Sequence, residues 1–149
     1  MPEPVPAPVP VRIFVAQFFP GAMAKTQTAT KKNVLPKELT RAIELAIDRK
    51  GVDMMLLDLR GLSNSTDYFL LVNGTSDTHV RSIAEHVEQE LKKEGVTVAH
   101  VEGLTQGRWV LLDYVDFVVH VFHPTLREFY QLERLWSDAK VIPVDQQGD

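Results

Sequence analysis

Two apolar runs joined by a tight acidic turn constrain this chain more than any other feature. Residues 107–122 read G-R-W-V-L-L-D-Y-V-D-F-V-V-H-V-F, which predicts two short strands with a turn between them. Residues 127–136, R-E-F-Y-Q-L-E-R-L-W, have the spacing of an amphipathic helix. The run carries Trp109 and Tyr114, residue types that are enriched at binding surfaces, and contains no set of catalytic groups, so it favours a surface that docks to another molecule.

The spacing of apolar residues in the rest of the chain predicts further helices and strands, and thus an α/β domain. Helices are predicted at 36–50, 78–94 and 124–136, and strands at 52–59, 68–72, 96–101, 109–113 and 117–122. Interleaved helices and strands predict a mixed sheet of about five strands covered by helices. The apolar stripes of the three helices are Leu39, Ile43, Ala46 and Ile47, then Val80, Ile83, Ala84, Val87 and Leu91, then Phe129, Leu132 and Trp136.

Composition divides the chain into three parts. Residues 1–33 begin with a Pro at every second position, which excludes helix and central strand and predicts a flexible extension. Residues 34–140 are predicted to form one domain, and residues 141–149 a flexible tail. Met23 opens a polar segment that resembles an ordinary N-terminus, so we hypothesise that residues 1–22 are dispensable.

The net charge of the domain indicates which kinds of molecule it can bind. Of 16 basic and 20 acidic residues, four bases and a single acid fall in residues 1–33, so the remainder carries a net charge of −7. An acidic domain is a poor ligand for a phosphate backbone, and no direct sequence-specific nucleic-acid binding is expected. It suits a basic protein partner, although acidity also serves solubility alone. No apolar run reaches the ~18 residues of a membrane span, and the absence of Cys fits a reducing compartment, so a cytoplasmic location is expected.

One turn resembles an anion site. Residues 73–76 (N-G-T-S) lie between a predicted strand and a helix N-terminus, where free N–H groups bind anions. A nucleotidyl-transferring site would also need two carboxylates one residue apart on a neighbouring strand to hold magnesium. Glu102 stands alone on the next strand, and Asp113 and Asp116 are three apart. A helix cap is therefore favoured over catalysis, while a nucleotide-binding or nucleotidyl-transferring enzyme stays open as the alternative.

The histidines and serines give no catalytic or metal-binding pattern. The five His residues lack metal-ligand spacing, and His120 is interpreted as a hydrogen-bonded sheet residue. Ser63, Ser65 and Thr66 have no base with an orienting acid, which favours a polar turn. No catalytic residue, no metal and no cofactor is predicted.

Trp109 could belong to the core or to an interface. Alternation puts Trp109, Leu111 and Asp113 on one face of their strand, and Val110 with Leu112 on the other, which is the natural core side. Because Trp109 shares its face with an acid, we expect it to be partly exposed and to be a candidate binding anchor.

Several ungapped blocks together resemble one known family. They are D-L-R-G-L-S-N-S-T-D-Y-F-L (58–70), N-G-T-S-D (73–77), E-G (102–103), W-V-L-L-D-Y-V-D-F-V-V-H-V-F (109–122) and R-E-F-Y-Q-L-E-R-L-W (127–136). In order and spacing they are similar to the ribosomal silencing factor family, also called Iojap-like, over residues 35–139. The chain departs from the family at Val115, where Gly is common, and this puts the tightness of the turn in question.

The resemblance implies a fold, a function and a contact surface. The fold is nucleotidyltransferase-like α/β without the catalytic carboxylates, and the protein is not an enzyme. It implies binding to a ribosomal protein of the large subunit at the intersubunit face, which blocks subunit joining and represses translation under nutrient limitation. It also implies a homodimer. The contact residues that it implies are Trp109, Val110, Leu111, Leu112, Asp113, Tyr114 and Asp116.

Overall fold

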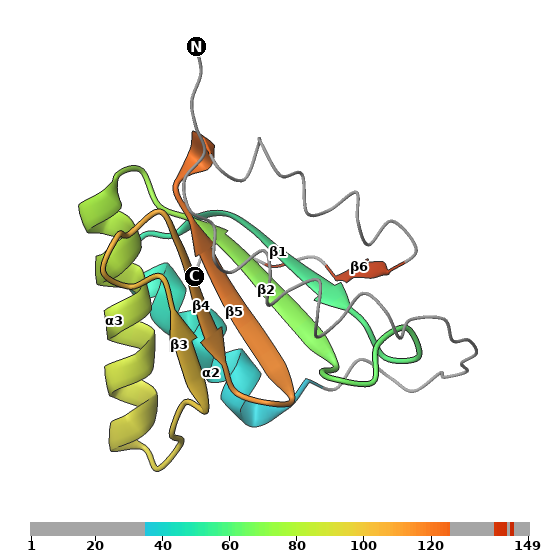
Figure 1. Cartoon of the computed structure of the whole chain (residues 1–149). Coiled ribbons are helices and arrows are strands. Elements are labelled where there is room, and N and C mark those ends of the chain that lie inside the picture. The colour runs from blue at the N-terminus through green and yellow to red at the C-terminus, as the bar shows by residue number, and fades with distance from the viewer. Residues whose placement is uncertain (1–34, 126–138, 143, 145–149) are drawn as a thin grey trace.

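Six strands form one mixed sheet in the computed structural model, which describes residues 35–125, 139–142 and 144 (Figure 1). The sheet order is β3-β4-β5-β2-β1-β6. The elements are α2 (Lys37–Asp48), β1 (Val52–Asp58), β2 (Tyr68–Asn73), α3 (Asp77–Lys93), β3 (His100–Glu102), β4 (Trp109–Asp113), β5 (Phe117–Phe122) and β6 (Lys140–Ile142). The expected mixed α/β class is therefore confirmed, with one strand more than predicted.

The centre of the sheet joins strands that are distant in sequence. β2 and β5 pair in parallel, from Tyr68 opposite Phe117 to Asn73 opposite Phe122. The other pairs are antiparallel, and β4 with β5 forms a hairpin. Because β2 and β5 start at the same end of the sheet, the segment before β2 lies beside the β4–β5 turn, at the lower end of the sheet in Figure 1.

The two described helices pack on one face of the sheet, and α3 does so through the apolar stripe that the sequence predicts. All five stripe residues of α3 are buried, and the Ser76 Oγ accepts the His79 N–H at 3.0 Å as the N-cap. In α2 the buried residues are Leu39, Ala42, Leu45 and Ala46. Ile43 and Ile47 are only partly buried, so the α2 stripe is rotated by a fraction of a turn from the expected one.

Both faces of the sheet carry an apolar layer. The layer under α2 and α3 includes Val110, Leu112, Tyr114 and Phe117. The layer on the opposite face consists of Leu57, Leu59, Phe69, Leu71, Trp109, Leu111, Val118 and Phe122. A strand buried on both faces loses the simple alternation of apolar and polar residues, which is the pattern of β4 and β5 here.

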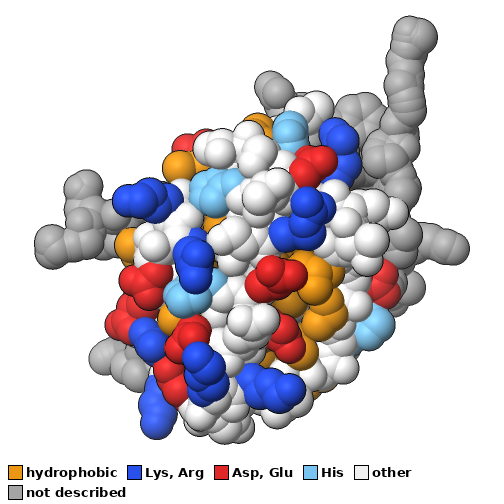
Figure 2. All heavy atoms as spheres, turned by 90° about the vertical axis from the view of Figure 1, so that its left-hand side faces the viewer, with side chains coloured by type: hydrophobic (Ala, Val, Ile, Leu, Met, Phe, Trp, Pro, Cys, Tyr) orange, Lys and Arg blue, Asp and Glu red, His pale blue; other side chains and the backbone are white. Residues whose placement is uncertain are grey.

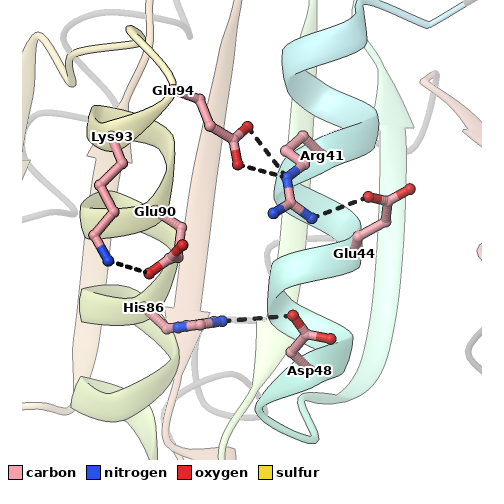
Figure 3. Close-up of polar contacts among 7 residues, drawn as sticks. All are labelled: Arg41, Glu44, Asp48, His86, Glu90, Lys93 and Glu94. Atoms are coloured by element: carbon pink, nitrogen blue, oxygen red, sulfur yellow. Dashed lines mark hydrogen bonds and ion pairs between the residues drawn. The ribbon is translucent and has the colours of Figure 1, made fainter.

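The outer surface of the helices is a solvated polar face. Arg41 on α2 reaches Glu94 at 2.9 Å beyond the end of α3, and His86 lies 3.5 Å from Asp48 (Figure 3). Figure 2, which views the molecule from the α3 side, shows acidic and basic side chains interspersed over this face. Exposed pairs of this kind contribute little to stability.

The structure changes three predicted boundaries. The strand expected at 96–101 shortens to β3, because Val96 donates to Leu91 O and completes the turn after α3. The flexible tail expected from residue 141 is wrong for Val141 and Ile142, which pair with β1 as part of β6. Three residues are too few to give a periodic signal. The predicted extension and most of the predicted helix at 124–136 lie outside the described residues.

Candidate functional site: the tip of the β4–β5 hairpin

The turn between β4 and β5 is tight and held by three hydrogen bonds. Tyr114 N–H donates to Phe117 O, and Asp116 N–H donates to Tyr114 O, both at 2.9 Å. The second bond spans only two residues, which makes a γ-turn with Val115 at its centre, at φ +75°. Asp113 Oδ1 accepts the Val115 N–H at 2.8 Å. Val in place of Gly therefore does not loosen the turn; it adds backbone strain, because a β-branched residue rarely adopts this φ.

Four side chains gather on the surface at this turn, and we call them the tip patch: Asp67, Asp113, Val115 and Asp116. Asp67 N–H donates to Asp116 O at 3.0 Å, which ties the segment before β2 to the turn. Burial raises the pKa of Asp67, and the negative charge of Asp116 raises it further. The two carboxylates are thus close enough to repel one another, and the tip patch is acidic.

Arg60, whose positive charge lowers the pKa of Asp67, is paired with Asp58. Its guanidinium makes two bonds to the Asp58 carboxylate, at 2.9 and 2.7 Å, and lies over the Tyr68 ring at 5.4 Å. Burial alone would raise the pKa of Asp58, but the Arg60 bonds outweigh it and hold that pKa below its ordinary value. Because Arg60 is paired with Asp58, none of the described basic side chains forms a salt bridge with an acid of the tip patch.

The aromatic anchor expected in β4 is buried. Trp109 is 3% exposed, so the expectation of partial exposure is wrong. Its Nε1–H donates to His120 Nδ1 at 3.1 Å, and its ring lies 5.1 Å from that of Phe122. The reason is the second apolar layer: the face that ends in Asp113 is covered, and the acid emerges only where the strand ends. The interpretation of His120 as a hydrogen-bonded sheet residue is confirmed.

The other implied contact residues divide between core and tip. Val110 and Leu112 are buried under the helices, and Leu111 in the opposite layer. Asp113 is half-buried and Asp116 is exposed. Of the seven residues, only these two acids reach solvent to a substantial degree, so the buried ones set the position of the tip.

Tyr114 lies just inside the tip. It is 8% exposed and stacks on Phe117 with 5.0 Å between ring centroids. Its hydroxyl is buried and has no hydrogen-bond partner in the described part of the chain. Burial raises the pKa of Tyr114 well above the ordinary value, and the charge of Glu88 adds to the shift.

The N-G-T-S turn is a helix cap, as predicted, and two of its backbone N–H donors are bonded within the chain. Gly74 N–H donates to Phe122 O at 2.9 Å and Thr75 N–H to His79 Nδ1 at 2.8 Å. A Cβ at Gly74 would come within 3 Å of Val80, so glycine is needed there for close packing of the turn against α3. Hydrogen bonds within the chain therefore use the N–H groups of Gly74 and Thr75, two of the donors that an anion at this turn could otherwise bind.

The remaining polar groups serve local structure. Ser63 Oγ accepts the N–H groups of Ser65 and Thr66, which confirms the polar turn before β2. His100 lies 2.6 Å from Glu102 in β3. Among the residues that the structure describes, no three His, Asp or Glu side chains are grouped to hold a metal ion, and no helix is long and apolar enough to cross a membrane.

Two members of the tip patch are absent from the residues that the sequence implies. Val115 stands in D-Y-V-D, and an apolar residue between turn acids is the signal that could have found it. Asp67 comes to the tip only because β2 pairs in parallel with β5, which no local pattern encodes.

Fold and surface together define a small mixed α/β domain that exposes acids around one valine at the tip of its β4–β5 hairpin. The family model described as "Ribosomal silencing factor during starvation" matches residues 32–149. The chain therefore belongs to the ribosomal silencing factor family.

Individual relatives agree with this assignment. The ribosomal silencing factor of Bacillus subtilis is 42% identical over 98 residues, covering 66% of this chain and 83% of that protein. A crystal structure of a Chromobacterium violaceum protein has a TM-score of 0.67 at 36% identity, covering 75% of this chain and 92% of that one. A more distant mouse relative, "Mitochondrial assembly of ribosomal large subunit protein 1", is 25% identical over 67% of this chain and 45% of its own length.

Proposed function

We propose that this protein binds the large ribosomal subunit through the tip of its β4–β5 hairpin and blocks joining of the small subunit. Translation is then repressed when nutrients are limiting. The family match over residues 32–149 carries the proposal. The name of the mouse relative, which concerns assembly of the large subunit, supports the choice of that subunit.

The chemistry of the tip supports a basic ribosomal protein as the contact. The tip patch presents three carboxylates around one apolar side chain on a rigid turn. Opposite charge accelerates association and orients the encounter, whereas phosphate would be repelled. The half-buried Asp113 and the exposed Asp116 make the contact, and the buried residues hold the tip in place: Trp109, Val110, Leu111, Leu112 and Tyr114.

The proposed action is stoichiometric and cytoplasmic, without catalysis or cofactor. The internal hydrogen bonds of the Gly74 and Thr75 N–H groups, together with Glu102 as the single acid of β3, favour this over nucleotidyl transfer. A homodimer is part of the proposal; sedimentation equilibrium over a concentration series tests it, and a monomer mass at all concentrations would remove it.

The test is cosedimentation with separated ribosomal subunits, combined with light scattering to follow subunit joining. The protein is expected to travel with large subunits and not with small ones, and to reduce joining in proportion to its occupancy. Asp113→Asn/Asp116→Asn keeps the turn acceptor and should weaken binding, while Glu85→Gln, an exposed acid on α3, should not. Equal affinity for both subunits, or for neither, would refute the proposal.

A further inference from the structure

Val115 is the most exposed large hydrophobic residue of the described chain, at 59%, and it lies at the centre of the tip patch. It belongs to neither apolar layer, so the fold gains little from its side chain. At φ +75° it also strains the backbone, at a cost of order 1–3 kcal/mol for such a residue. Folding alone therefore does not account for a valine at this position.

The surroundings hold this side chain in one place. The hydrogen bonds to Asp113 Oδ1 and Tyr114 O fix the backbone on both sides of Val115. A β-branched side chain has few rotamers, so little conformational entropy is lost when it is covered. Val115 is thus a preorganised apolar knob.

The charges around the knob specify what can cover it. Asp113 and Asp116 flank Val115 in sequence, and Asp67 is tied to Asp116 by a backbone hydrogen bond. A complementary surface has an apolar depression bordered by Lys or Arg side chains, which a basic protein supplies. A sugar–phosphate backbone offers neither the depression nor the charge.

We propose that Val115 is a specificity-determining contact of this protein, inserting into an apolar depression bordered by basic side chains on its protein partner. The inference rests on the proposed function and adds the residue that gives the acidic tip its selectivity. Charge brings the surfaces together, and the apolar contact distinguishes a matching basic surface from other basic surfaces.

The decisive variant is Val115→Thr, which keeps the size, the branching and the backbone strain but replaces a methyl group by a hydroxyl. Its matched control is Val141→Thr on β6, which is 54% exposed and lies three strands from β5 in the sheet order. Affinity for purified large subunits is measured by titration of the dye-labelled full chain, and thermal melting is measured on the same preparations.

Val115→Thr is expected to raise the Kd for the large subunit about five- to tenfold with little change in melting temperature, as for loss of a partly buried apolar contact. Val115→Gly should also bind more weakly, yet melt about 2–5 °C higher because the strain is relieved. Val141→Thr should change the Kd by less than about twofold. Wild-type affinity in Val115→Thr would overturn the inference alone; failure of the wild-type protein to bind at all would remove the proposed function and this inference with it.

A charge variant distinguishes protein from RNA as the surface that covers the tip. Asp113→Asn/Asp116→Asn should bind large subunits more weakly if the tip meets basic side chains. Tighter binding of this variant would mean that the acids face phosphate, and would overturn the inference.

Discussion

At the scale of single residues, the Trp109–His120 pair fixes the inner face of the hairpin. The indole N–H donates to His120 Nδ1, so the imidazole is neutral there and carries its proton on Nε2. His120 is fully buried and its ring lies 4.5 Å from that of Phe69 on β2. The hydrogen bond thus joins β4 to β5 inside an apolar layer, and the ring contact with Phe69 adds β2.

Truncation of Trp109 should therefore unfold the protein before it affects binding directly. Trp109→Ala is expected to reduce the free energy of unfolding by about 3–5 kcal/mol, and Trp109→Phe by about 1–3 kcal/mol because His120 Nδ1 loses its donor. Urea denaturation measures both. Asp116→Asn, an exposed change on the same hairpin, should stay within about 0.5 kcal/mol. An unchanged midpoint for Trp109→Ala would mean that the ring is not packed as the structure has it.

The buried Tyr114 hydroxyl gives a prediction with a pH dependence. Because it has no hydrogen-bond partner in the described part, Tyr114→Phe should leave stability unchanged or raise it by up to about 1 kcal/mol. Burial raises the pKa of Tyr114 in the folded state, so the unfolded chain loses the hydroxyl proton at a lower pH than the folded protein does. The free energy of unfolding therefore keeps its full value below the unfolded pKa of about 10 and falls as the pH rises above it.

Urea denaturation at a series of pH values between about 9 and 12 tests this predicted fall in stability. The wild-type protein should lose more stability over that range than Tyr114→Phe, while Tyr68, whose pKa burial also raises, contributes equally to both. Parallel pH profiles would show that the Tyr114 ring is exposed to solvent.

At the scale of elements, the β3–β4 connection depends on Gly103. This residue has φ +80°, and a Cβ there would overlap the carbonyl oxygen of Trp109. The close approach lets β3 turn back against β4, with Val101 opposite Leu112. Glycine at this position therefore fixes where β4 begins.

Gly103→Ala is expected to cost about 2–4 kcal/mol of stability, through both the left-handed φ and the backbone overlap. Gly95→Ala is the matched control: its φ is +93°, but nothing lies within 4 Å of an added Cβ, so only the conformational cost of about 1 kcal/mol applies. Thermal and urea denaturation of the two variants distinguish the cost of the left-handed φ, which both share, from the cost of the backbone overlap, which only Gly103→Ala has. Equal losses of stability in the two variants would show that the backbone at Trp109 moves away from the added Cβ without a free-energy cost.

The elements differ in how far the sequence predicts them. α3 follows from its N-cap and a stripe repeated over four turns, and both features hold in the structure. β3 and β6 have three residues each, and their pairing depends on β4 and β1 and not on their own pattern. The prediction that Trp109 is partly exposed fails for a related reason: β4 is covered on both faces, so the alternation of its residues does not distinguish a buried side from an exposed side.

At the scale of the whole molecule, internal hydrogen bonding at the Gly74 turn predicts the absence of nucleotide binding. Thr75 N–H and His79 N–H are bonded to His79 Nδ1 and Ser76 Oγ. Calorimetric titration with magnesium nucleotides should therefore give no heat of micromolar binding. Saturable binding that is lost in Gly74→Ala would restore the enzyme alternative.

The site was predictable from the sequence only in part. The acidic turn with Asp113 and Asp116 follows from the D-Y-V-D pattern and the family resemblance. Asp67 does not, because it reaches Asp116 through a parallel pairing that the chain makes over a long sequence separation. Long-range topology of this kind has no local signature.

That same parallel pairing bears on how a new copy of the protein matures. β2 is made early and β5 much later, so during synthesis β2 has only β1 as a neighbour until β5 leaves the ribosome. Asp67 and Asp116 come together only at that moment, with the end of the chain still to follow. Until β5 has emerged, a copy under synthesis thus lacks the completed acidic tip, and the ribosome that makes it is not yet exposed to the surface through which we propose that the protein binds the large subunit.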